Sequence, residues 1–69
     1  MTPQEATVKL KDLGWTDRRM AELTNSSTST INRIRLGQAA TVDFDMGMKL
    51  IAEAKKQARR AEKMAHGND

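Results

Sequence analysis

The chain has no cysteine and no tyrosine, and it has only one proline, one tryptophan, one phenylalanine and one histidine. Without cysteine it can form neither a disulfide nor a thiolate metal site, and His66 has no partner ligands near it in the sequence. A Ser–His–acid or Cys–His set is equally excluded. We therefore expect no metal, no cofactor and no enzymatic activity. Two aromatic residues are also too few for the stacking platforms that bind single-stranded nucleic acid.

Long apolar runs are missing as well. No stretch approaches the roughly 20 apolar residues of a membrane-spanning helix, and the apolar segment of a signal peptide is not found. We expect a protein with no membrane contact that works in the cytoplasm. The 69 residues carry a net charge of +3, with a pI near 9.7, which favours a polyanionic partner. A chain of this size buries only about 60% of its unfolded surface, so a second copy is a natural source of added stability.

Helix start and stop signals divide the chain. Thr2 followed three residues later by Glu5 is a capping box, Pro3 suits a first helical position, and Gly14 suits a helix end. Thr16 is a good N-cap, with Trp15 before it and Met20 after it spaced as a hydrophobic staple. These signals predict helices over residues 3–13 and 17–24.

The stretch from Thr24 to Thr30 is almost entirely Ser and Thr and resembles a flexible linker. Its flanks indicate otherwise. Asn25 tolerates the left-handed backbone of a turn, Ser27 can cap a new helix, and Ile31 and Ile34 follow at helical spacing. The sequence therefore predicts a turn and then a helix over residues 28–36, ended by Gly37.

A last helix is predicted over residues 44–64, capped by Asp43 or Thr41, with Gly47 allowing a split near its start. Its early apolar part is Met48, Leu50, Ile51 and Ala54, and its later part is lined by Ala58, Ala61 and Ala65. The fold class is thus an all-α bundle of four to five helices in one domain, residues 1–65, followed by a frayed tail, residues 66–69. The predicted core residues are Leu10, Leu13, Met20, Leu23, Ile31, Ile34, Leu50 and Ile51.

A helix-turn-helix needs a small residue within its first helix, a turn residue that tolerates positive φ, and apolar residues on the inner side of its second helix. Ala21, Asn25, Ile31 and Ile34 meet these needs in order. With Ser27 to Ile31 and Gly37, the segment from Leu13 to Ile51 resembles the Cro/repressor family of phage helix-turn-helix proteins. It departs from the family at Asn25, usually Gly, at Ser26, usually apolar, and at Asp17, often Gln, where a carboxylate would repel a phosphate.

The resemblance implies a transcription regulator that binds double-stranded operator DNA through the helix after the turn. Because so short a chain has no room for an effector or activation domain, we expect it to repress by occlusion. Arg33 can bind guanine in a bidentate way, and Asn32 can pair with adenine or a phosphate. The side chains implied to face base edges are Thr28, Ser29, Asn32 and Arg33. Those proposed to contact phosphates are Thr16, Arg18, Ser27, Arg35 and Gln38. For Arg35 a salt bridge to Asp43 or Asp45 is the alternative.

The last helix leaves several alternatives open. Its basic run, Lys55, Lys56, Arg59, Arg60 and Lys63, suits either attraction to DNA or an ordinary solvated face. Its alanine stripe suits packing on the chain's own core or on a second copy, and we expect a homodimer formed through residues 44–65. An antitoxin that binds both DNA and a toxin is a second function compatible with the sequence. A helical adaptor without a DNA role is a third.

Overall fold

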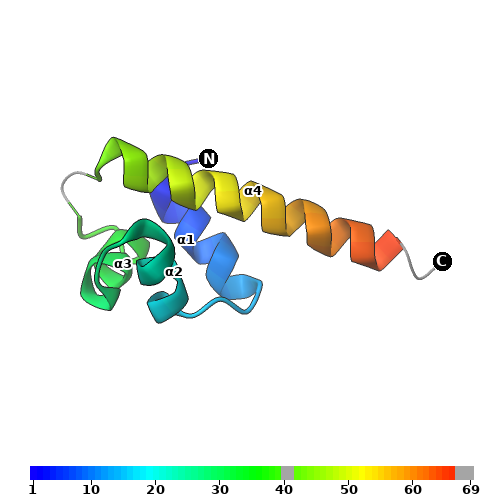
Figure 1. The fold of residues 1–69 in the computed structure, drawn as a ribbon, viewed down its shortest axis with the longest axis horizontal. Coiled ribbons are helices and arrows are strands. Elements are labelled where there is room, and N and C mark those ends of the chain that lie inside the picture. Colours follow the sequence, from blue (N-terminus) through cyan, green and yellow to red (C-terminus); the bar gives the residue numbers. More distant parts are fainter. Residues whose placement is uncertain (40–41, 67–69) are drawn as a thin grey trace.

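The computed structural model of the protein describes residues 1–39 and 42–66, the last three of these by their backbone alone. The described residues form α-helices without strands, so the all-α prediction is confirmed (Figure 1). The helices are α1 (Pro3–Asp12), α2 (Asp17–Thr24), α3 (Thr28–Arg35) and α4 (Phe44–His66). Residues 40–41, which include the predicted cap Thr41, and residues 67–69 lie outside the described part of the chain.

The three short helices begin where their caps were predicted. Thr2 Oγ1 accepts a hydrogen bond from the Glu5 backbone N–H at 3.1 Å, and Glu5 Oε1 accepts one from the Thr2 N–H at 2.8 Å. Thr16 Oγ1 accepts from the Arg19 N–H at 3.1 Å, and Ser27 Oγ accepts from the Thr30 N–H at 3.2 Å. Each cap satisfies a backbone donor that its helix leaves unpaired.

These three helices also share one type of C-terminal ending. Gly14, Asn25 and Gly37 take left-handed φ values of 96°, 53° and 73°. After each of them the next residue donates its N–H back into the helix, as in Trp15 to the Leu10 carbonyl at 2.9 Å. This pattern is a Schellman motif, which satisfies terminal carbonyls. Because the left-handed residue follows a helical cap residue, α1 ends at Asp12 and α3 at Arg35, each one residue short of the predicted end.

The core gathers apolar side chains from all four helices. The completely buried large side chains are Leu10, Met20, Ile31 and Leu50. Each contributes about 1.5–3 kcal/mol by leaving water. Trp15, Ala21 and Ile34 close around them. The predicted core residues Leu13, Leu23 and Ile51 are only half-buried.

Helix α4 is continuous across Gly47, so the suggested split does not occur. A Cβ at this position would lie 3.1 Å from Pro3 Cγ, which means that the glycine lets α1 and α4 approach closely. The first turn of α4 is closed by the Gly47 N–H, which donates to the Asp43 carbonyl at 2.8 Å. Asp43, one of the two predicted caps, therefore occupies the N-cap position. The cost of a helical glycine is offset here by close packing.

Helix α4 is much longer than its partners and extends past them at its C-terminal end (Figure 1), giving a molecule of 43 × 19 × 19 Å. Along the alanine stripe, Ala54 is buried, Ala58 half-buried and Ala61 exposed. The stripe thus packs on the chain's own core at its start and leaves it towards its end. Among the described residues, no helix has the length and apolar character needed to cross a bilayer.

Candidate nucleic-acid interface

Helices α2 and α3 are joined by a short turn over residues 25–27, in the order that the sequence predicted. Asn25 makes the reversal in a left-handed conformation. Ser26, where the resemblance to the Cro/repressor family led us to expect an apolar residue, is half-buried. Its hydroxyl lies 2.7 Å from Thr24 Oγ1, which itself donates to the Met20 carbonyl at 2.9 Å. A hydrogen-bonded pair of hydroxyls therefore occupies this part of the turn.

Helix α3 has one buried and one open side. Ile31 and Ile34 are buried, whereas Thr28, Ser29 and Arg33 are exposed. Because Ser29 and Arg33 are four residues apart, they lie one turn above each other on the helix. The same spacing relates Thr28 to the half-buried Asn32. The four predicted base-reading residues therefore share one side of α3.

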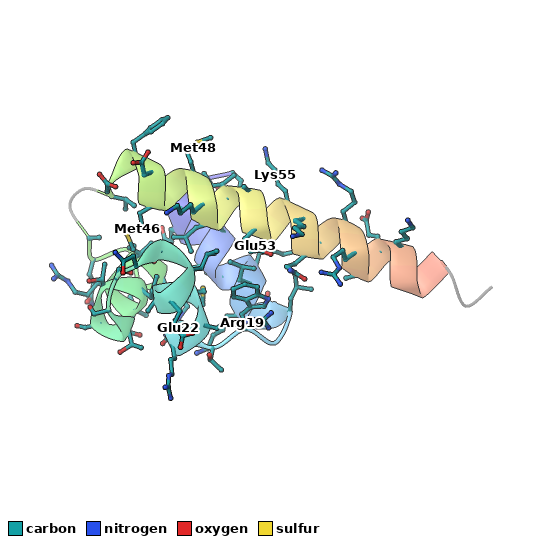
Figure 2. All side chains as sticks on the ribbon, in the orientation of Figure 1. Arg19, Glu22, Met46, Met48, Glu53 and Lys55 are labelled. Carbon is teal, nitrogen blue, oxygen red and sulfur yellow. The ribbon has the colours of Figure 1, made fainter. Side chains whose placement is uncertain are left out.

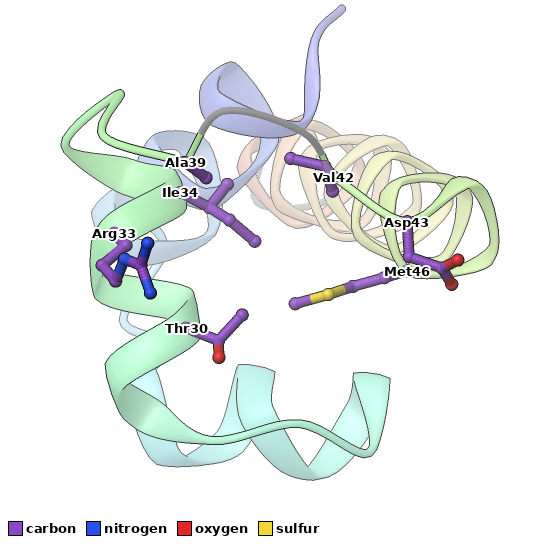
Figure 3. A pocket seen from close by; sticks show the side chains of 7 residues that line it. All are labelled: Thr30, Arg33, Ile34, Ala39, Val42, Asp43 and Met46. Atoms are coloured by element: carbon purple, nitrogen blue, oxygen red, sulfur yellow. The ribbon is translucent and has the colours of Figure 1, made fainter.

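Next to the open side of α3 lies a cleft of about 340 Å³, between α3 and the start of α4 (Figure 3). Figure 3 shows Met46 of α4 pointing towards α3 across the cleft. Its lining consists of Thr30, Arg33, Ile34, Ala39, Val42, Asp43 and Met46. Arg33 therefore lies at the edge of open space, and no helix of the described part of the chain covers it.

Arg35 is half-buried, and its guanidinium is bound by other side chains of the protein. Its side chain is 19% exposed, and its guanidinium donates to Asp17 Oδ1 on α2 and, at 2.6 Å, to Asn32 Oδ1. The alternative prediction, a salt bridge from Arg35 to Asp43 or Asp45, was wrong, because the packing of α2 on α3 places Asp17 beside this arginine. A guanidinium with two internal acceptors is poorly placed to meet a phosphate. Arg35 orients Asn32 instead, leaving the amide group of that side chain as the free donor.

The negative charge of Asp17 is compensated by two neighbouring cations. Besides Arg35, Lys11 Nζ lies 3.4 Å from Asp17 Oδ1. Burial raises the pKa of Asp17, but the hydrogen bonds and charges of Arg35 and Lys11 outweigh it, so the pKa lies below its ordinary value. The expected repulsion between this carboxylate and a phosphate is thus countered by two cations. Lys11 was not singled out from the sequence, since nothing local links it to Asp17.

The remaining predicted phosphate contacts are exposed: Thr16, Arg18, Ser27 and Gln38. The Asp17–Arg35 pair brings the start of α2 beside the end of α3, so Thr16 and Arg18 lie near one end of α3 and Ser27 at the other. Arg18 Nε lies 3.4 Å from Glu22 Oε1, but both side chains are largely exposed, at 86% and 71%. Such a pair is worth little, and its arginine can exchange the carboxylate for another anion.

A second arginine at the start of α2 was also missed from the sequence. The Arg19 guanidinium stacks 4.0 Å from the centre of the Trp15 ring. The ring is 8% exposed and belongs to the core, so it fixes a cation at the surface. With Arg18, this arginine makes the start of α2 basic despite Asp17.

The basic run on α4 is exposed at all five positions. Figure 2 shows Lys55 projecting from the side of α4 that faces away from α2 and α3. Lys55 therefore lies on a different side of the molecule from the open side of α3. The arrangement favours the reading of Lys55 as part of a solvated face.

The described residues hold no group of three or more His, Cys, Asp or Glu side chains placed to bind a metal ion. Comparison of the chain with models of protein families, with curated proteins and with solved structures found no match.

Proposed function

We propose that the protein is a sequence-specific, double-stranded DNA-binding regulator of transcription, of the phage Cro-like repressor type. The observation that carries this proposal is the open side of α3, on which Thr28, Ser29, Asn32 and Arg33 lie opposite the buried Ile31 and Ile34. A helix that is buried along one side and polar along the other can enter a major groove while remaining anchored to its domain.

The chemistry of this surface suits base edges. Arg33 is exposed and has no acid beside it on α3, so it can bind the O6 and N7 of guanine. Arg35 donates to the side-chain oxygen of Asn32, so the amide N–H groups of Asn32 are the part of this side chain that can donate to a base or a phosphate. The small hydroxyls of Thr28 and Ser29 allow the helix to approach closely. One bidentate contact supplies about 1–3 kcal/mol of discrimination between base pairs.

Phosphates on either side of the groove would be met by Thr16, Arg18, Ser27 and Gln38. Arg35, assigned to a phosphate from the sequence, acts in this proposal as a positioning residue for Asn32. We expect the protein to act as a homodimer on a two-fold symmetric operator in a bacterial cytoplasm, with half-sites about 10 base pairs apart.

Fluorescence anisotropy with a labelled duplex pool of random sequence, about 30 base pairs long so that two half-sites fit, tests DNA binding. We expect binding whose affinity falls steeply as salt rises, because each phosphate contact releases counterions. Arg18→Ala should weaken binding to all sequences. Lys63→Ala, which removes the same charge from the far end of α4, should leave it nearly unchanged. Binding that is absent, or indifferent to salt, would reject the proposal.

The extension of α4 beyond the bundle supports a second candidate, an antitoxin that also binds DNA. Ala61 is exposed there and lies among the exposed cations Arg59, Arg60 and Lys63. An exposed helix surface of this kind can dock on another protein. Co-expression in the native host followed by affinity capture distinguishes the two: an antitoxin retains one stoichiometric partner through residues 57–66, and a repressor does not.

A further inference from the structure

The outer side of the first half of α4 carries an apolar patch that the chain's own core leaves uncovered. Phe44 is 76% exposed and Met48 is 51% exposed. They lie four residues apart and are therefore neighbours on the helix, and the half-buried Ile51 follows three residues later. Figure 2 shows Met48 pointing away from the helices below α4. Contiguous exposed apolar surface is typical of interaction sites on soluble proteins.

The patch includes a recess as well as projections. A cleft of about 210 Å³ lies between the start of α1 and α4, and its lining residues are Pro3, Val42, Asp43, Phe44, Gly47, Met48 and Ile51. Gly47, which has no side chain, leaves the cleft open between Phe44 and Ile51. An exposed aromatic ring and a recess lined by apolar groups thus lie next to each other on one surface.

We propose that this patch binds the same patch of a second copy, with the two α4 helices antiparallel around a two-fold axis near Met48. In such a pairing Phe44 of each copy lies beside Ile51 of the other, at the edge of the recess. When one surface carries both a projection and a recess, a two-fold axis pairs the projection of each copy with the recess of the other. This self-complementarity is the property of an isologous interface. A different partner would need to supply its own projection and would leave Phe44 without a recess.

The charges around the patch select the antiparallel direction. Asp43 and Asp45 lie at the start of α4, whereas Lys49, Lys55 and Lys56 follow on its exposed side. Antiparallel pairing sets the acidic start of one helix beside the basic stretch of the other. Parallel pairing would place like charges together, which is unfavourable. The interface therefore lies in the first half of α4, rather than along the alanine stripe, whose Ala54 is buried in the chain's own core.

Cross-linking with a short bifunctional maleimide tests the direction directly, since the chain has no cysteine of its own. Met48→Cys should cross-link two copies rapidly. Lys55→Cys, on the same side of α4 (Figure 2), should not, because antiparallel pairing separates the two introduced thiols by about 20 Å along the axis. Cross-linking at both positions would show a parallel dimer, and cross-linking at neither would show that the patch is free. Either result overturns the inference.

Sedimentation equilibrium without DNA measures the association itself. Met48→Lys should raise the dimer dissociation constant by about tenfold or more, because it places a charge at the centre of the interface. Val8→Lys, at a 42% exposed apolar residue of α1 outside the cleft, should not change it. Circular dichroism checks that both variants fold. A monomeric wild type, or a Met48→Lys variant that associates equally well, contradicts the inference.

This inference rests on and deepens the proposed function, in which two copies bind one operator. The interface and the DNA-binding function can nevertheless fail separately. A dimer that binds no DNA leaves the interface standing and rejects the regulator. A wild type that binds DNA but stays monomeric rejects the interface alone. If both hold, Met48→Lys should retain binding to a duplex with one half-site and lose the added affinity for a duplex with two.

Discussion

Arg35 on α3 donates a hydrogen bond to Asp17 on α2, a residue eighteen positions earlier in the chain. The pair joins the end of one helix to the start of the other and so helps to fix the angle between them. Its side chains are 19% and 23% exposed, so water screens the pair only in part. Because Arg35 also holds Asn32, the same contact links the packing of α2 on α3 to the surface proposed to read DNA.

We expect the loss of either partner to lower stability. Asp17→Ala and Arg35→Ala should each reduce the free energy of unfolding by about 1–3 kcal/mol, since each leaves a partly buried charge without its partner. The double variant should cost clearly less than the sum of the two. The exposed Arg18–Glu22 pair serves as the control, and its coupling should be below about 0.5 kcal/mol. Additive effects at Asp17 and Arg35 in urea unfolding would show that the pair is not formed.

Acid should weaken the fold in a defined range of pH. Asp17 has a lowered pKa in the folded chain, and so has Glu5, whose pKa is lowered by its hydrogen bonds with Thr2. The unfolded chain therefore binds more protons as the pH falls below the ordinary carboxyl range near about 4. The free energy of unfolding should be level above that range and fall below it. Asp17→Asn should give a shallower fall, and an equal slope in both proteins would remove Asp17 from the explanation.

The left-handed turn residue should tolerate glycine but not alanine. At Asn25, with φ of 53°, Ala lacks the polar side chain that lets Asn adopt this conformation, and its Cβ costs about 1–2 kcal/mol there. Asn25→Gly should be close to neutral, and Asn25→Ala should lower the thermal midpoint. Thermal unfolding followed by circular dichroism measures both. Equal midpoints for the two variants would mean that the turn does not require a positive φ.

Gly47 tests the crossing of α1 and α4. Gly47→Ala gains about 1 kcal/mol of helix propensity and loses a similar amount through its close contact with Pro3, so we expect little change. Gly47→Leu should cost about 1–3 kcal/mol, because the larger side chain forces the helices apart. Ala52, exposed on the same helix, provides the control, and Ala52→Leu should be nearly neutral. A stabilising Gly47→Leu variant in urea unfolding would contradict the close approach.

Local features of this fold could be predicted because their causes lie within a few residues. Thr2, Thr16 and Ser27 cap helices through hydrogen bonds to residues three positions later. Gly14 and Gly37 end helices because their backbone conformation excludes most other residues. The position of Ile31 and Ile34 on one side of α3 likewise follows from spacing alone.

Contacts between distant segments could not be predicted in the same way. Arg35 had acidic residues on both sides in the sequence, and only the packing of α2 on α3 selects Asp17. Helix α4 has apolar residues around much of its circumference, so spacing did not decide which of them face the core. The packing of α1 on α4 buries Leu50 and Ala54 and leaves Phe44 and Met48 outside.

The most direct measurement of the central claim is a selection of bound sequences from a pool of random double-stranded DNA, made with the wild type and with Arg33→Ala. We expect the wild type to enrich a two-fold symmetric motif with half-sites about 10 base pairs apart. Arg33→Ala should relax the preference at one position in each half-site, most simply a guanine. A wild-type pool that stays random, or a motif that is unchanged in Arg33→Ala, would contradict the account of α3 as the DNA-reading helix.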